Sequence, residues 1–225
     1  MIYAHAGNVD FESLHYQTFA ADDDGIVPLT DEFWFEDDAA QRMNEFLQTV
    51  WGAENLENNK TWLAESIGQK TSETADETLR RYLASNFYKD HLQTYKKRPI
   101  YWCFSSGKQS AFQALVYLHR YNESTLARMR NHYVVPLMGR LQNRIEMLEK
   151  DRDSAPSPAS KNKIGKEIER FNKKKMELTA FDEKLRHYAD MRISLDLDDG
   201  VKVNYEKFGD LLAEVKAVTG GSSDE

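Results

Sequence analysis

The feature that most constrains this chain is a pair of long helical stretches joined by a short polar link. The first runs from Ser124 to about Lys150 and the second roughly from Lys161 to Met191, with DRDSAPSPAS between them. Apolar residues recur in steps of three and four in both stretches, which places them on one side of each helix. Two such helices with a short link predict a long antiparallel, coiled-coil-like hairpin over residues 124–191. The first seam comprises Val134, Met138, Leu141, Ile145 and Leu148, and the second comprises Ile164, Ile168, Phe171, Leu178, Leu185 and Tyr188.

Two residues disturb this pattern. Pro136 lies early in the first stretch, and it predicts a kink because proline lacks an N–H and clashes with the preceding turn of helix. Lys175 occupies a seam-like position in the second stretch, where its charge interrupts the apolar series.

The first 98 residues predict an acidic, helical portion that follows an irregular start over residues 1–35. A helix through AAQRMNEFLQTVWG is capped by Asp37 or Asp38 and ends at Gly52. A second helix fits NKTWLAESIG, and a third fits ADETLRRYLASNFYKDHLQTYKK. The third must end near Lys97, because the proline at position 99 disfavours helical backbone in the residue before it.

After this portion the pattern changes to short runs that are rich in aromatic and apolar residues. PIYWCF and SAFQALVYLHRY, separated by SSGKQ, predict two antiparallel strands. The last segment, SLDLDDGVKVNYEKFGDLLAEVKAV, predicts a strand, an Asp-Gly turn, a second strand and a short helix. The expected fold is therefore a helix-dominated α+β fold with N-terminal helices, a small antiparallel sheet and the helical hairpin. The expected division lies between residues 1–98 and residues 99–225.

Composition restricts the kind of protein. Of the 225 residues, 40% are hydrophobic and 30% are charged, which is enough apolar material for a sizeable core. Cys103 is the single cysteine, so an internal disulfide is excluded and a reducing compartment is expected. The sequence has no apolar run of about 20 residues and no secretory signal pattern. We therefore expect a cytoplasmic protein without membrane contact.

Charge is distributed unevenly along the chain, although its formal net value is −7. Residues 1–60 hold 13 acidic side chains against two basic ones, whereas residues 126–188 hold 15 basic against nine acidic. A basic hairpin beside an aromatic-rich sheet is suited to following a phosphate backbone. A solvated helix exterior has the same composition, so the pattern leaves both interpretations open. The candidate DNA-binding residues are Lys96, Lys97, Arg98, Lys108, Arg128, Arg130, Lys173 and Lys174.

Catalytic motifs find little support in the sequence. GKQS lacks the spacing of a phosphate-binding P-loop, because Trp102 stands where the first glycine belongs and Gln109 follows the lysine. Cys103 lies within a predicted strand and is interpreted as a small core residue. The six histidines show no metal-ligand spacing, and Glu214 with Lys216 forms an E-x-K pattern in a predicted helix rather than a strand. We therefore expect no catalytic residue and no metal site.

Several long strings resemble a known family. KKRPIYWCFSSGKQSAFQALVYLHRY and FDEKLRHYADMRISLDLDDGVKVNYEKFGDLLAEVKAVTGG are similar to the C-terminal region of the PglX family. IYAHAGN and DGIVPLTDEFWFEDDA extend the resemblance over nearly the whole chain. The family comprises adenine-specific DNA methyltransferases of BREX phage-defence systems.

The resemblance implies a non-catalytic C-terminal domain of a larger enzyme. The family's glycine-rich loop for S-adenosylmethionine and its Asn-Pro-Pro-Tyr-type motif have no counterpart here, since no two prolines are adjacent and no G-x-G occurs. The cofactor would then belong to the parent enzyme, and Met1 would be an internal or engineered start. Implied partners are double-stranded DNA, other BREX subunits and a phage DNA-mimic inhibitor. The alternatives are a protein-interaction module without DNA contact and, more remotely, an independent nuclease.

Overall fold

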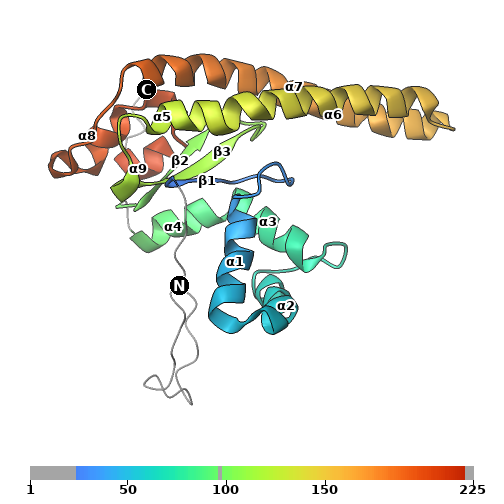
Figure 1. The fold of residues 1–225 in the computed structure, drawn as a ribbon, viewed down its shortest axis with the longest axis horizontal. Coiled ribbons are helices and arrows are strands. Elements are labelled where there is room, and N and C mark those ends of the chain that lie inside the picture. Colours follow the sequence, from blue (N-terminus) through green and yellow to red (C-terminus); the bar gives the residue numbers. More distant parts are fainter. Residues whose placement is uncertain (1–23, 96–97, 221–225) are drawn as a thin grey trace.

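The computed structural model describes residues 24–95 and 98–220. A long helical hairpin lies along one side of the molecule, a three-stranded sheet packs beneath it, and a lobe of short helices lies beyond the sheet (Figure 1). The expected helix-dominated α+β class is confirmed. No helix within the described residues is both long enough and apolar enough to cross a membrane.

The predicted hairpin is confirmed, and its two arms lie side by side over most of their length (Figure 1). The link between the arms is short, and Ser157 caps the second arm by accepting a hydrogen bond from the Ser160 N–H at 3.1 Å. Apolar side chains from both arms, including Leu141 and Leu178, are buried between the arms and against the sheet. The elements are α5 (Thr125–Met129), a π turn (Arg130–Val134), α6 (Val135–Ser154) and α7 (Pro158–Asp190).

The π turn lies directly before Pro136, the residue predicted to kink the first arm. Here the Val135 N–H donates to the Arg130 carbonyl, five residues back instead of four. Such a turn widens the helix locally. It accommodates the proline ring without ending the helix.

The predicted strand pair is also confirmed. β2 (Tyr101–Ser105) and β3 (Gln113–Tyr117) pair antiparallel. A third strand, β1 (Ile26–Pro28), lies within the segment that the sequence predicted to be irregular, and it pairs antiparallel with β3. The sheet order is β1-β3-β2, so β1 is an edge strand, which is where a strand tolerates a proline.

Both faces of the sheet are covered. On the hairpin side, Phe104, Ala114 and Val116 join the main core with the apolar residues of α5, α6 and α7. On the opposite face, Cys103 and Leu115 form a smaller cluster with residues of α4. The hairpin is therefore fixed to the sheet along one side and remains open to solvent along the other.

The lobe beyond the sheet is anchored by a buried ion pair. Asp38 caps α1 by accepting the Gln41 N–H at 3.0 Å, and its carboxylate is fully buried against the Arg80 guanidinium. The cap and the end of this helix agree with the prediction. The single helix expected over residues 75–97 is wrong, because the chain breaks at Asn86 into two helices. The elements are α1 (Ala39–Trp51), α2 (Leu56–Ser66), α3 (Ala75–Ser85) and α4 (Phe87–Tyr95).

The two strands predicted near the C-terminus are also wrong. This segment forms short helices instead, α8 (Gly200–Glu206) and α9 (Val215–Thr219). Tyr205 and Phe208 pack edge-on against Trp102 with ring centroids 5.2 and 5.6 Å apart, which a helical turn allows from one side of the segment. A single bridge between Phe104 and Leu212 is the remaining strand-like contact here.

Candidate nucleic-acid interface

Residues 31–37, which we call the strap, cross the hairpin on its sheet side and tie it to the lobe. On the α7 side, Asp31 accepts from the Lys174 ammonium at 2.7 Å, and Glu32 accepts from the Arg170 guanidinium at 2.7 Å. Trp34 then meets Phe171 edge-on, with ring centroids 6.2 Å apart. Acidic side chains of the strap therefore neutralise two cations of the hairpin.

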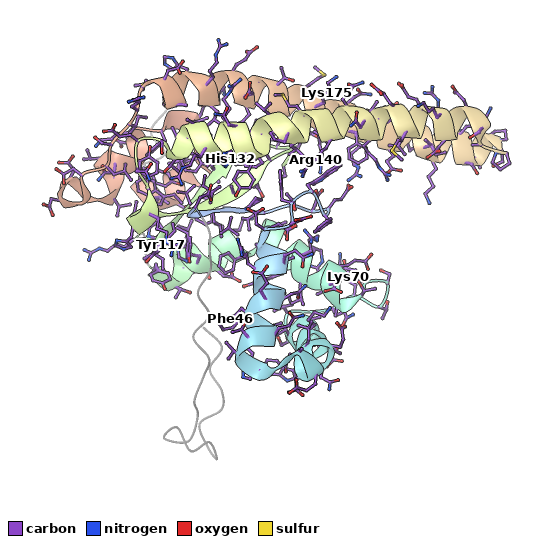
Figure 2. The ribbon with its side chains drawn as sticks, viewed as in Figure 1. Phe46, Lys70, Tyr117, His132, Arg140 and Lys175 are labelled. Carbon is purple, nitrogen blue, oxygen red and sulfur yellow. The ribbon has the colours of Figure 1, made fainter. Side chains whose placement is uncertain are left out.

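The strap also contacts the first arm of the hairpin. Arg140 donates to the Trp34 carbonyl, and its guanidinium lies over the Phe35 ring at 5.1 Å from the centroid. Tyr133, in the π turn, donates its hydroxyl to Asp37 at 2.7 Å. Burial and this hydrogen bond raise the pKa of Tyr133, so its hydroxyl remains protonated at neutral pH. Figure 2 labels His132, which lies in the π turn, and Arg140, which lies in α6.

Glu177 of α7 holds the turn between β2 and β3. Its carboxylate accepts from the Ser106 hydroxyl at 2.7 Å, from the Gln109 N–H at 2.7 Å and from the Ala111 N–H at 3.2 Å. The donors of the GKQS turn are therefore directed at a carboxylate of the same chain. This geometry accounts for the glycine and for the Ser106 hydroxyl of the turn without a bound phosphate.

A row of cations runs along one exposed face of α7 beside this turn. Positions 163, 166, 170 and 173 step by three and four, so their side chains share one face, and Glu177 follows on that face one turn after Lys173. Over the ten residues from the first lysine to the last, the row extends about 15 Å. We call the row, together with the turn lysine, the α7 cationic face. It comprises Lys163, Lys166, Arg170, Lys173 and Lys108.

Four members of this face are free of ion pairs. The side chains of Lys163, Lys166, Lys173 and Lys108 are exposed, and none forms an ion pair with the residues of 24–95 or 98–220. Arg170 is the exception, since it pairs with Glu32. Exposed lysines that form no ion pair within the chain are available to bind an external polyanion.

The structure brings two of the predicted site residues to this face and places others elsewhere. Lys173 precedes Glu177 by one helical turn, while Lys108 lies between Gly107 and Gln109, which both lie against Glu177. Arg98 is exposed before the other end of β2, away from the turn. Lys96 and Lys97 lie outside the described residues.

Three further predicted residues have partners inside the chain. Lys174 is buried and paired with Asp31, so it is not a surface cation. Arg130 forms an ion pair with Asp182 at 2.8 Å. Arg128 is half-buried and donates to the Thr125 hydroxyl at 3.4 Å.

Sequence reasoning missed Lys163, Lys166 and Arg170, although their spacing relative to Lys173 was a usable signal. The spacing also explains Lys174, which lies three residues after Phe171 and four before Leu178, both buried. The position of Lys174 in this apolar series predicts that its aliphatic side chain faces the core, whereas Lys173 faces solvent.

Other chemically suggestive residues occupy core positions. Cys103 is buried, and burial raises the pKa of its thiol to about 12. His91 lies among aromatic rings and accepts from the Tyr101 N–H at 3.3 Å, and burial lowers its pKa. Glu214 immediately precedes α9, so the E-x-K pattern lies in a helix. Within the described residues, no group of three or more His, Cys, Asp or Glu side chains is arranged to hold a metal ion.

Comparison with known proteins gives two informative relatives. The chain is 55% identical over 233 aligned residues to the adenine-specific methyltransferase BrxX of Escherichia coli O9:H4 (strain HS), an alignment that covers 100% of this chain. It is 42% identical over 207 residues to the adenine-specific methyltransferase PglX of Lacticaseibacillus casei (strain Zhang), which covers 91% of this chain. No family model matches the sequence.

The matched regions are small parts of these relatives, since the chain spans 19% of the first and 17% of the second. Identity at this level over nearly all of the chain indicates common ancestry and the same fold for the matched region. The resemblance seen in the sequence is thus confirmed: nearly the whole chain is similar to one region of two adenine-specific methyltransferases, BrxX and PglX.

Proposed function

We propose that this chain is a non-catalytic region of an adenine-specific DNA methyltransferase, and that it holds duplex DNA by phosphate contacts through the α7 cationic face. The observation that carries the proposal is the row of exposed lysines without ion-pair partners beside the turn of Lys108. The relatives are named adenine-specific methyltransferases. The family that the sequence resembles acts on adenine in DNA, and such an enzyme must hold DNA while it acts on one base.

The shape of the face suits this role. Duplex DNA carries one negative charge per about 1.7 Å of axis, so a straight row of lysines about 15 Å long faces several phosphates at once. Phosphate contacts position a protein on DNA without reading its sequence. The region would therefore add affinity and orientation, while methyl transfer from S-adenosylmethionine and base recognition belong to the rest of the enzyme.

The rigidity of the face supports the same role. Glu177 fixes Lys108 relative to α7 through three hydrogen bonds to the turn, and the main core fixes α7 to the sheet. Because the backbone that carries these lysines is already ordered, only side-chain freedom is lost when phosphates bind. The arrangement suits recognition of a regular anionic surface such as a duplex.

The test is fluorescence anisotropy of this chain with a labelled duplex over a salt titration. A triple variant, Lys163→Glu, Lys166→Glu and Lys173→Glu, is expected to weaken binding and to lower the slope of log K against log salt by about 2.7, or 0.9 for each lost contact. The matched control changes three exposed lysines on other elements, Lys89→Glu, Lys202→Glu and Lys216→Glu. Equal losses in the two variants, or no binding by the unmodified chain at low salt, would contradict the proposal.

A second candidate function is supported by one observation in the lobe. Trp62 on α2 is 60% exposed, and the exposed Glu65 lies about one helical turn after it. Exposed tryptophans are enriched at protein-contact surfaces. This proposal assigns the lobe to a basic partner within the defence system. It predicts that Trp62→Ala weakens binding to purified defence subunits in a calorimetric titration and leaves DNA binding unchanged.

A further inference from the structure

An open cleft of about 650 Å³ lies between the strap and the first arm of the hairpin. Its most prominent feature is Phe33, whose side chain is 57% exposed although its neighbours Trp34 and Phe35 pack inward. The remaining lining comes from residues 36 and 37 of the strap and from the π turn and α6. The complete lining is Phe33, Trp34, Phe35, Glu36, Asp37, His132, Tyr133 and Arg140.

The outward position of Phe33 is fixed by contacts on both sides. Before it, Glu32 is held by Arg170 at 2.7 Å. After it, the Trp34 carbonyl is held by Arg140, and Asp37 is held by the Tyr133 hydroxyl at 2.7 Å. The strap is therefore bonded to both arms of the hairpin. Because the chain is held on each side of Phe33, the exposed ring belongs to an ordered part of the surface.

The cleft combines the groups that bind a nucleotide outside a duplex. Phe33 offers an aromatic surface: the Arg80 guanidinium lies 6.0 Å from its ring centroid, and the exposed part of the ring can stack with any base. Arg140 and the exposed His132 supply hydrogen-bond donors for a phosphate, and Arg140 is already held over the Phe35 ring. Glu36 supplies an acceptor of the kind that takes a hydrogen bond from an exocyclic base amine. An aromatic platform beside cations is the usual arrangement for unpaired nucleic acid.

The strap links the cleft to the α7 cationic face. Glu32, which contacts Arg170 of that face, is the residue directly before Phe33. A duplex along α7 would therefore bring one of its strands to the edge of the cleft. We propose that the cleft receives a single unpaired nucleotide of DNA, with its base stacked on Phe33 and its phosphate bound by Arg140. This inference rests on the proposed binding of duplex DNA by α7.

The test compares the affinity of the chain for two labelled DNAs that differ in one nucleotide. One is a perfect duplex, and the other is the same duplex with a single bulged 2-aminopurine. The unmodified chain is expected to bind the bulged DNA at least about fivefold more tightly, the lower limit for stacking of one base on an aromatic ring. Stacking should also quench the 2-aminopurine fluorescence on binding.

The decisive variant is Phe33→Ala, with Trp62→Ala as its control. Both residues are exposed aromatics, with 57% and 60% of their side chains accessible, but Trp62 lies on α2 and away from the cleft. Phe33→Ala should abolish the preference for the bulge and the quenching while leaving the affinity for the perfect duplex unchanged, and Trp62→Ala should alter neither. Retention of thermal stability by Phe33→Ala will show that the strap remains folded.

The outcomes separate this inference from the proposed function. Equal affinity of the unmodified chain for both DNAs would overturn the base-binding cleft and leave duplex binding intact. A preference that survives in Phe33→Ala would also overturn it and would direct attention to a protein partner for the exposed ring. Failure to bind either DNA would overturn both proposals.

Discussion

The Gln109 N–H donates to the Glu177 carboxylate at 2.7 Å, so a side chain of α7 fills the turn between β2 and β3. This contact joins residues that are 68 positions apart and orients the Lys108 backbone beside the hairpin. The internal anion takes the place that a bound phosphate has in a phosphate-binding loop.

Replacement of Glu177 by alanine should release this turn. The variant loses three hydrogen bonds to the carboxylate, from the Ser106 hydroxyl and two backbone N–H groups. We expect the free energy of unfolding to fall by about 1–3 kcal/mol, because hydrogen bonds to charged groups are among the stronger ones. Urea unfolding followed by circular dichroism measures the change. Glu183→Ala, an exposed position on the same helix, should change the stability by less than about 0.5 kcal/mol.

Two neighbouring lysines of α7 should give opposite phenotypes. Lys173 is exposed, whereas Lys174 is buried and bound to Asp31. Lys173→Ala is expected to leave the stability nearly unchanged and to reduce the salt slope of DNA binding by about 0.9. Lys174→Ala should lower the free energy of unfolding by about 1–2 kcal/mol through its lost ion pair and buried stem. The same stability change in both variants would show that the outward and inward assignments are wrong.

Stability should depend on pH through Glu73. Hydrogen bonding to the Arg81 guanidinium, with further contributions from Lys70 and Thr78, lowers the pKa of this carboxyl to about 2. The ordinary value is about 4.3, so the folded state favours the carboxylate. Its contribution is therefore complete above about pH 5 and is lost as the pH falls toward 2.

The check is a comparison of Glu73→Gln with the unmodified chain in urea at pH 6, 4 and 2.5. The variant should be less stable at pH 6, and the difference should shrink steadily toward pH 2.5. A difference that is independent of pH would contradict the assignment, because the amide does not titrate.

Cys103 should be inert in the folded protein. Burial raises the pKa of its thiol to about 12, so at pH 8 its thiolate fraction is roughly three orders of magnitude below that of an ordinary thiol near 8.5. A thiol reagent should therefore react slowly with the native chain and rapidly in denaturing urea. Since Cys103 is the single cysteine, the signal reports this position alone. Rapid labelling of the native chain would show that the sheet face over α4 opens readily.

The hairpin could be predicted from the sequence because its information is local. Its apolar residues repeat with the helical period, and the proline-containing link between its arms excludes a single longer helix. The prediction for the C-terminal segment was wrong because it also relied on a local pattern. The alternation around Val201 and Val203 is typical of a strand. Packing against the sheet decided the outcome, because Tyr205 of α8 and Phe208 in the turn after it both reach Trp102.

The strap could not be predicted, because it has no period of its own. Its aromatic and acidic residues are ordered by contacts with α6 and α7, which lie more than 100 positions further along the chain. The candidate site depended on these distant contacts. The sequence predicted Lys108, Lys173 and Lys174 alike as DNA-binding residues, and it could not separate the exposed pair from Lys174, whose partner, Asp31, is 143 residues away.

The contacts of the strap also show where part of the acidic charge of the N-terminal portion lies. Asp31 and Glu32 behave as counterions that are tethered to the hairpin, so part of the negative charge of residues 1–60 is held against α7. An isoelectric point near 5.5 therefore describes the sum of the charges and not the sign of the field that a duplex meets along α7. A shortened chain that begins after the strap would leave Arg170 and Lys174 uncompensated. We expect such a chain to bind polyanions of any kind more strongly and with less discrimination.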